Sequence, residues 1–391
     1  MAVYDNKEIN AAVKVLKNNS LALMDGPKVR LLEKSVAKIF GKNYGLMVNS
    51  GSSANLLALA SLNIKKNSEV ITPALTFSTT VAPIIQLGLV PRFIDVEPNK
   101  FVCNADQIES NITKNTKVLM IPNLLGNLAE WDKIMNLAKK YNLKVIEDSA
   151  DTIGYKFKKI KAGTKSDIVT TSFYASHVVT GAGFGGMVCF NNKNLYFKAK
   201  LLRGWGRSST IFGETEDPKS RFNAKISGID YDAKYIFGDF GYNFLPSEIS
   251  AAFALEQIKK LKKNISKRIN NFNHLKKFFL EYKNFVDVPE SFNGVKTGWL
   301  AFPVILKKNT KIKRRDLQIF LEKNNIQTRT VFTGNIIKQP AFKNQKYKKN
   351  KEGYLESNHV MKNGILIGCH HGLNQSDIAY IKNKFIEFFK R

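Results

Sequence analysis

One histidine stands among residues that could do chemistry in the segment SFYASHVVTGAGFGG (172–186). The chain has only five histidines, and His177 lies between a hydroxyl-flanked aromatic pair and a run of glycines. Its imidazole could act as a base, ligate a metal, lie beside a phosphate loop or simply pack. The glycines at 181–186 match G-x-G-x-x-G, but they precede an apolar strand and do not open a helix. We therefore predict loop glycines and no dinucleotide site.

Two further clusters could bind a charged ligand. Residues 49–55 (NSGSSAN) follow an apolar run and open a helical pattern, so free backbone N–H groups there could bind a phosphate. N-capping of that helix by Ser52 or Ser53 is the alternative interpretation. Glu147 and Asp148 end the run LKVIED, and a carboxylate at the mouth of a buried strand needs a cation or a strong donor. A protonated ring nitrogen would serve, and so would a structural arginine.

The elements that must position these residues form an α/β pattern. Apolar strands alternate with helix-period segments such as 53–64 and 128–141, which predicts a mostly parallel sheet covered on both faces. In such sheets, functional groups gather at the C-terminal ends of the strands. The predicted strands are 45–50, 69–74, 90–96, 117–123, 143–149, 167–174 and 185–190.

The pattern changes after Pro246, where a long helical run (246–282) leads into shorter elements at 299–306, 314–324, 364–369 and 376–389. We predict a large domain over 1–248. The long helix and a small C-terminal α/β domain make up 249–391.

Composition excludes several classes of protein. With 391 residues and 43% hydrophobic content, the chain is not disordered. No apolar run reaches the roughly 18 residues of a membrane span. The N-terminus lacks a signal pattern, so we expect a cytoplasmic protein without a membrane partner. The three cysteines are too scattered for disulfides or a metal site, and His370–His371 is interpreted as a turn pair rather than as metal ligands.

The formal net charge of +29 raises the question of nucleic acid. The lysines alternate with Asn and Ile throughout the chain, which indicates a biased composition spread over solvated faces. We therefore predict no nucleic-acid partner, although a basic nucleic-acid binder stays open as an alternative.

Taken together, the motifs resemble the nucleotide-sugar aminotransferase family, pyridoxal-phosphate enzymes on the aspartate-aminotransferase-like fold. The resemblance covers nearly the whole chain and implies a mostly parallel, seven-stranded sheet in the large domain. Its segments match in order and spacing: SGSSANLLALASL, ITPALTFSTTVAPI, VPRFIDVEP, VIEDSAD, TTSFYASHVVTGAGFGGMV and GDFGYNFLPSEISAAFALEQIKKL.

The resemblance also implies roles for single residues. Asp148 matches the carboxylate that pairs with the pyridine nitrogen and keeps the ring protonated as an electron sink. Phe77 matches the aromatic residue that stacks on the ring, although by itself it would pass as a core residue. The phosphate cradle would consist of Gly51, Ser52 and Ser172. Asn243 matches a residue that reaches a phosphate across the subunit interface, which implies a homodimer with a shared active site.

The chain departs from the aminotransferases at His177, where they carry the lysine that binds the cofactor covalently. Lys165 lies 12 residues before this position and Lys193 lies 16 residues after it. An imidazole cannot form a stable covalent link with the cofactor's aldehyde. The resemblance therefore implies pyridoxal or pyridoxamine phosphate bound non-covalently, and a histidine that moves protons.

The same Lys-to-His change marks a branch of the family, the C-3 dehydratases of 4-keto-6-deoxy nucleotide sugars. Asp151 stands where aminotransferases usually have a glutamine facing the cofactor's phenolic oxygen, and the dehydratases carry an acid there. NLLGN (123–127), TGN (333–335) and the segment ending at His371 resemble the iron–sulfur-free dehydratase of GDP-4-keto-6-deoxymannose. Asn123 thereby becomes a substrate-binding candidate. Residues 204–223 contain no cysteine, so we expect no iron–sulfur cluster.

The resemblance thus implies C-3 dehydration in the synthesis of deoxysugars for surface polysaccharide, with glutamate regenerating the amine cofactor. Arg329 is the candidate for a carboxylate contact, and a surface ion pair is its alternative. Val178 and Phe184 depart from the dehydratases, which mostly carry a second histidine and an acid at these positions. A 4-aminotransferase-like protein without the lysine, and a non-catalytic cofactor binder, stay open as alternatives.

Overall fold

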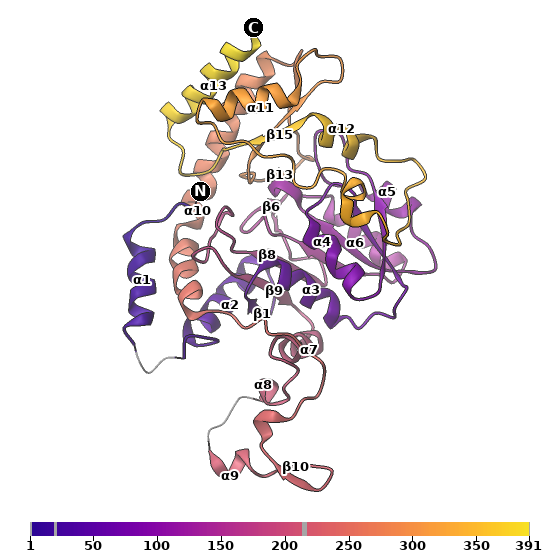
Figure 1. Ribbon diagram of the computed structural model, residues 1–391, viewed down its shortest axis with the longest axis vertical. Helices are drawn as coiled ribbons and strands as arrows, with labels where there is room; N and C mark the ends of the chain where they lie inside the picture. The colour runs from indigo at the N-terminus through magenta and orange to yellow at the C-terminus, as the bar shows by residue number, and fades with distance from the viewer. Residues whose placement is uncertain (1, 19–21, 213–216, 391) are drawn as a thin grey trace.

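A seven-stranded sheet forms the centre of the molecule (Figure 1) in a computed structural model that describes residues 2–18, 22–212 and 217–390. The strand order is β1-β9-β8-β5-β4-β2-β3, and only β9 runs against its neighbours. The strands are β1 (Tyr44–Val48), β2 (Glu69–Pro73), β3 (Val90–Ile94), β4 (Thr116–Pro122), β5 (Lys144–Asp148), β8 (Ile168–Ser172) and β9 (Gly186–Phe190). The predicted strands and the mostly parallel sheet are confirmed.

Both faces of the sheet are buried because apolar side chains point alternately up and down each strand. In β1, Leu46 and Val48 pack on one face, and Met47 packs on the other. One layer consists of α3 (Gly51–Ser61), α4 (Ser78–Gln86) and α7 (Lys193–Arg203), and the opposite layer contains α2 (Pro27–Phe40) and the start of α10. Further along the sheet lie α5 (Ala105–Ser110) and α6 (Trp131–Lys140).

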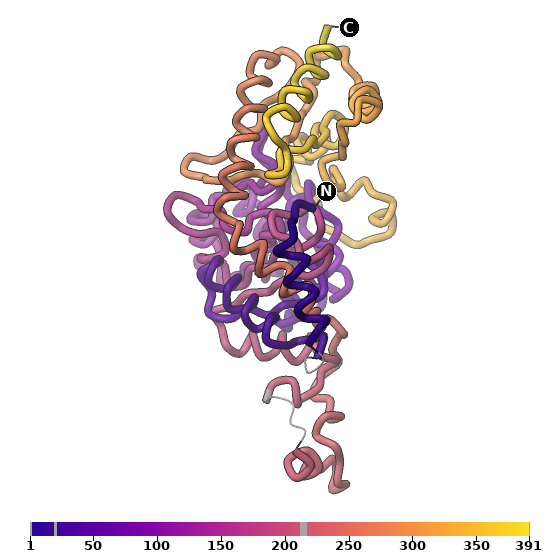
Figure 2. Tube along the Cα trace, turned by 90° about the vertical axis from the view of Figure 1, so that its left-hand side faces the viewer, coloured from indigo at the N-terminus to yellow at the C-terminus, as the bar shows by residue number. Residues whose placement is uncertain are grey.

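The long helix α10 (Glu248–Glu281) runs from the sheet into the C-terminal elements, with α1 (Asn6–Leu16) alongside it (Figures 1 and 2). Those elements are an antiparallel sheet of β12 (Val286–Asp287), β14 (Phe302–Leu306) and β15 (Gly364–Ile367), with α11 (Arg314–Lys323), α12 (Leu355–Asn363) and α13 (Gln375–Phe389). Their core is aromatic, since Phe272 stacks on Trp299 and Phe279 on Phe302. A smaller C-terminal α/β unit is therefore present, and its boundary at residue 248 stays a prediction.

Two small sheets complete the fold. One joins β6 (Lys156–Phe157), β7 (Ile160–Lys161) and β13 (Val295–Lys296) beside the main sheet. The other is the hairpin of β10 (Ala224–Ile226) and β11 (Ile229–Tyr231), which projects from the body with α8 (Ser209–Phe212) and α9 (Pro218–Arg221) (Figure 1). In the part of the chain that the structure describes, no helix is long and apolar enough to cross a membrane.

Candidate active site

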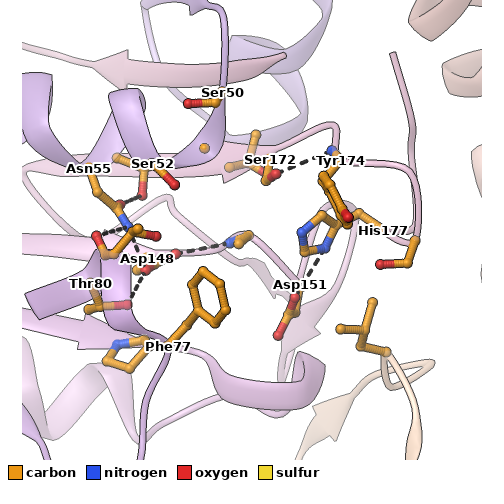
Figure 3. Close-up of a pocket in the computed structure, with 18 of the residues that line it drawn as sticks. Ser50, Ser52, Asn55, Phe77, Thr80, Asp148, Asp151, Ser172, Tyr174 and His177 are labelled. Atoms are coloured by element: carbon orange, nitrogen blue, oxygen red, sulfur yellow. Dashed lines mark hydrogen bonds and ion pairs between the residues drawn. The ribbon is translucent and has the colours of Figure 1, made fainter. Parts of the chain in front are cut away.

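A cavity of about 540 Å³ lies at the C-terminal ends of the parallel strands (Figure 3). This is the edge where α/β sheets place functional groups, because the loops after parallel strands meet there. The predicted residues that line the cavity are Gly51, Ser52, Phe77, Asn123, Asp148, Asp151, Ser172 and His177. The structure therefore gathers residues from the ends of β1, β2, β4, β5 and β8, whereas Asn243 and Arg329 are not among the lining residues.

Asp148 is the last residue of β5, and its carboxylate is buried at the base of the cavity. Its Oδ2 accepts hydrogen bonds from Asn55 Nδ2 and Thr80 Oγ1, both at 2.8 Å. The Ala150 backbone N–H donates to Oδ1 at 3.3 Å. Burial raises the pKa of Asp148, the three donors lower it, and the nearby Asp151 carboxylate raises it further. None of the ion pairs among the described residues includes Asp148, so a cation in the cavity would stabilise its charged form.

The aromatic wall of the cavity comes from two distant segments. Phe77 precedes α4 and is 48% exposed, which distinguishes it from a packed core residue. Phe332 meets it edge to face, with the ring centroids 6.0 Å apart, and also lines the cavity. An exposed ring beside a buried carboxylate is suited to stacking on a flat ligand.

The loop from β1 into α3 brings small residues against the end of β8. A Cβ added to Gly51 would lie 2.6 Å from Ser172 Cβ, so only glycine lets the two segments approach this closely. Ser50 is the N-cap of α3, and its hydroxyl accepts from the Ser53 backbone N–H at 3.0 Å. The alternative of capping by Ser52 or Ser53 is therefore wrong. Ser52 is exposed at the cavity, in the first turn of the helix.

His177 follows β8 in a tight turn, where its backbone N–H donates to the Tyr174 carbonyl at 3.0 Å. Its Nδ1 lies 3.2 Å from Asp151 Oδ1, although the pair lacks the alignment of a hydrogen bond (Figure 3). The other Asp151 oxygen accepts the Leu125 N–H at 3.0 Å. The carboxylate is thus held from one side and faces the imidazole with the other, which leaves Nε2 as the nitrogen turned away from Asp151.

The glycine run after His177 is a loop, as predicted. Gly183 and Gly185 have left-handed φ values of 99° and 115°, and the loop leads into β9. Phe184 is 72% exposed and lines the cavity, whereas the Val178 side chain is buried in the core and faces away from solvent. Of the two departures from the dehydratase pattern, only Phe184 therefore stands at the cavity.

Asn123 lies at the end of β4, but its side-chain polar atoms are occupied within the protein. Its Nδ2 donates to Glu147 at 2.8 Å and to Ser149 at 3.0 Å, and its Oδ1 accepts from Trp131 Nε1 at 3.0 Å. With 1% of its surface exposed, the residue forms part of the cavity wall.

Arg329 and Asn243 both lie outside the cavity of the single chain. Arg329 is exposed, and its guanidinium donates to the Thr328 carbonyl at 2.7 Å. Asn243 is exposed and forms a β-bridge with Gly204, near the base of the projecting segment. Its predicted role belongs to a second subunit, and the dimer stays a prediction.

Several lining residues received no role in the sequence-based prediction: Asn55, Thr80, Tyr174, Leu300 and Phe332. Asn55 lies three positions after Ser52, and Thr80 lies three after Phe77, so helical spacing from the predicted residues could have indicated both. No local signal marks Leu300 or Phe332, which come from the C-terminal part of the chain.

The cavity fits a flat, anionic, pyridine-type cofactor on its own geometry. It combines a buried carboxylate that pairs with no cation among the described residues, a half-exposed aromatic ring, and a helix N-terminus beside close-packed small residues. Oδ1 of Asp151 and Nδ1 of His177 are buried without an aligned hydrogen-bond partner. None of the described lining residues is lysine.

Fold and cavity together define an aspartate-aminotransferase-like protein. The solved "E coli GDP-4-keto-6-deoxy-D-mannose-3-dehydratase with bound hydrated PLP" superposes with a TM-score of 0.88 at 28% identity, over 98% of this chain and 97% of that one. The sequence matches the DegT/DnrJ/EryC1/StrS aminotransferase family over residues 3–386. The chain therefore belongs to this family, whose cofactor is pyridoxal phosphate.

Two curated bacterial relatives match most of the chain. The lipopolysaccharide biosynthesis protein RfbH of Salmonella typhimurium is 35% identical over 91% of this chain and 84% of its own length. The GDP-4-keto-6-deoxy-D-mannose 3-dehydratase of Yersinia pseudotuberculosis is 32% identical over 98% and 96%, respectively. The similarity to both relatives extends over most of the fold and is not confined to one motif.

Proposed function

We propose that the protein removes the C-3 hydroxyl of a 4-keto-6-deoxy nucleotide sugar, using pyridoxamine phosphate and glutamate, in the synthesis of a deoxysugar. The observation that carries the proposal is the pair His177–Asp151, with 3.2 Å between Nδ1 and Oδ1, in a cavity whose described lining holds no lysine. The names of the relatives support the same reaction.

Each lining residue then has a role that follows from its position. Asp148 would hold the ring nitrogen in its protonated form. Burial raises the pKa of this carboxyl, and a cation beside it offsets the cost of the buried negative charge. Phe77 would stack on the ring. The phosphate would be held by Ser52, Ser172 and the backbone beside Gly51, since unpaired N–H groups at a helix N-terminus favour anions. When bound, pyridoxamine phosphate supplies the amine that joins the C-4 carbonyl and a ring that withdraws electrons.

His177 would move the protons. With Nδ1 facing Asp151, the carboxylate favours a proton on that nitrogen and leaves the Nε2 lone pair free to act as a base. The same imidazole, once protonated at Nε2, can donate to the departing C-3 hydroxyl. A side chain that cannot bind the cofactor covalently leaves the site without the tether on which an aminotransferase depends.

The net reaction balances with glutamate as the reductant. The C-3 hydroxyl is replaced by hydrogen, and glutamate is converted to 2-oxoglutarate and ammonia, so that no nitrogen is retained in the sugar. In the proposed homodimer, Asn243 of one subunit would reach the phosphate in the other subunit's cavity. We assign the carboxylate contact for glutamate to Arg329. Because Arg329 is exposed and lies outside the cavity of the single chain, this contact requires either the homodimer or a movement of the Arg329 loop.

The test is incubation of the protein with pyridoxamine phosphate, glutamate and a panel of 4-keto-6-deoxy nucleotide sugars, followed by mass spectrometry. We expect one sugar of the panel to lose an oxygen atom. Gain of nitrogen at C-4 would instead establish a 4-aminotransferase, and no turnover of any sugar would indicate a cofactor binder without this activity.

A further inference from the structure

A fully buried arginine lies between the long helix and the C-terminal segment, outside the cavity. Arg268, on α10, is 1% exposed, and none of the ion pairs among the described residues includes it. Its Nε donates to His371 Nδ1 at 3.2 Å. Burial and the adjacent guanidinium lower the pKa of His371 to about 3, so this imidazole is neutral and accepts the hydrogen bond. A buried cation without a carboxylate is costly unless its other donors are used well.

Those donors are directed at the backbone beside the cavity. Arg268 Nη1 donates to the carbonyls of Trp299 and Leu300, at 3.1 and 3.0 Å. Leu300 lines the cavity, and its N–H donates to the Leu125 carbonyl at 2.7 Å. The guanidinium thus fixes the peptide group that contacts the loop after β4.

That loop in turn holds the carboxylate opposite His177. The Leu125 N–H donates to Asp151 Oδ2 at 3.0 Å, and Asp151 Oδ1 lies 3.2 Å from His177 Nδ1. A continuous series of contacts therefore runs from Arg268 through Leu300, Leu125 and Asp151 to the imidazole.

Leu125 in this series and Trp299, which directly precedes Leu300, have a backbone conformation that needs support. Leu125 has φ 59° and Trp299 has φ 47°, both in the left-handed region that costs about 1 kcal/mol or more for a side chain with a Cβ. Thr297 ties the same two segments together, because its hydroxyl donates to the Gly126 carbonyl and accepts the Trp299 N–H. Thr297 and Arg268 therefore both hold residues 299–300 against the loop after β4.

We propose that Arg268 is a positioning residue for the reaction: through Leu300 and Leu125 it orients the Asp151 carboxylate toward His177 and thereby sets which imidazole nitrogen faces the cavity as a free base. The inference rests on the proposed function for its catalytic consequence. Its structural part, the orientation of Asp151 and the tautomer of His177, can be measured without substrate or cofactor.

The experiment uses the full-length protein labelled with ¹⁵N-histidine. Imidazole nitrogen shifts report the tautomer of His177, assigned by the signal that disappears in His177→Gln, and hydrogen exchange reports the Leu125 amide. We expect the wild type to carry its proton on Nδ1. Arg268→Lys keeps the charge, but its side chain ends one bond short of the guanidinium nitrogen that donates to both carbonyls, so it should shift His177 toward the Nε2–H tautomer and speed exchange at Leu125.

Two companion variants separate positioning from folding. Thr297→Val removes the hydroxyl that ties residues 299–300 to the loop after β4 and leaves the buried charge of Arg268 in place. We expect it to change the His177 tautomer and the exchange at Leu125 in the same direction as Arg268→Lys. Arg92→Lys is the matched control, because Arg92 forms an ion pair with Glu69 at 2.8 Å, at the N-terminal end of β2, and does not contact the series. It should leave the tautomer and the Leu125 amide unchanged.

With pyridoxamine phosphate, glutamate and the sugar of the panel that the wild type deoxygenates, kcat should fall about 10²-fold in Arg268→Lys with KM little changed, the size expected for a catalytic group misplaced by about 1 Å. If the wild type turns over no sugar of the panel, the proposed function fails while the tautomer and exchange data still decide this inference. Folded Arg268→Lys and Thr297→Val proteins with the wild-type tautomer and wild-type exchange at Leu125 would overturn it.

Discussion

Replacing Asp148 by asparagine should separate protein stability from cofactor binding. The carboxylate is buried, has no ion-pair partner among the described residues, and is satisfied by Asn55, Thr80 and the Ala150 N–H. Burial raises the pKa of Asp148, which means that its charged form is unfavourable in the protein without a ring cation. Asp148→Asn removes that charge, and the free energy of unfolding of the cofactor-free protein should therefore not decrease.

The affinity for pyridoxamine phosphate should change in the opposite direction. The variant loses the charged acceptor for a protonated ring nitrogen, and breaking such a buried pair costs about 3 kcal/mol. At 1.4 kcal/mol per tenfold change, the dissociation constant should rise about 150-fold. Calorimetric titration of the cofactor-free protein measures this constant, and urea unfolding measures the stability.

Asp95→Asn is the matched control. Asp95 is a buried aspartate after β3, the last strand in the sheet order, and it accepts the backbone N–H groups of Glu356 and Ser357 at 2.8 and 2.9 Å. This variant should lose stability and keep its cofactor affinity. Asp148→Asn protein that binds pyridoxamine phosphate within about threefold of the wild type would refute the assigned role, since threefold corresponds to less than about 1 kcal/mol.

Three further predictions concern other positions. His177→Asn should reduce deoxygenation by about 10²–10⁴-fold in a coupled assay for 2-oxoglutarate, and His177→Lys should restore covalent cofactor, seen by borohydride trapping, while suppressing deoxygenation. Gly51→Ala should weaken phosphate-dependent cofactor binding in the same titration, because the new Cβ would lie 2.6 Å from Ser172 Cβ. Burial raises the pKa of Glu33 to about 7 from 4.5, so its contribution to stability is present below pH 4.5 and is lost as the pH rises through 7. The free energy of unfolding of Glu33→Gln, measured in urea, should therefore exceed that of the wild type by up to about 3 kcal/mol as the pH rises across that range.

The residues at the strand ends of the site were predictable because functional groups in parallel sheets gather at the C-terminal ends of the strands. Asp148 and Ser172 close apolar runs that only a buried parallel sheet can accommodate, and such strands place their ends at one edge. The resemblance to a known family added Phe77, whose exposed ring sets it apart from the core.

What sequence reasoning missed depends on long-range packing. Leu300 and Phe332 reach the cavity from the C-terminal part of the chain, and no local pattern announces that approach. Capping of α3 by Ser52 or Ser53 stood as an alternative because Ser50, Ser52 and Ser53 carry the same hydroxyl, and the extended backbone of Ser50 (φ −160°, ψ 161°) decides among them. The contact of Asp151 with His177 likewise depends on a loop conformation, φ 59° at Leu125, that leucine rarely adopts.

We propose that His177 directs the site toward removal of oxygen and away from transfer of nitrogen. The most direct measurement is the amount of ammonia released for each 2-oxoglutarate formed when the wild-type protein turns over its 4-keto-6-deoxy nucleotide sugar with glutamate. Deoxygenation predicts equal amounts of the two products. Formation of 2-oxoglutarate without ammonia would mean that the nitrogen stays in the sugar, and would contradict the claim.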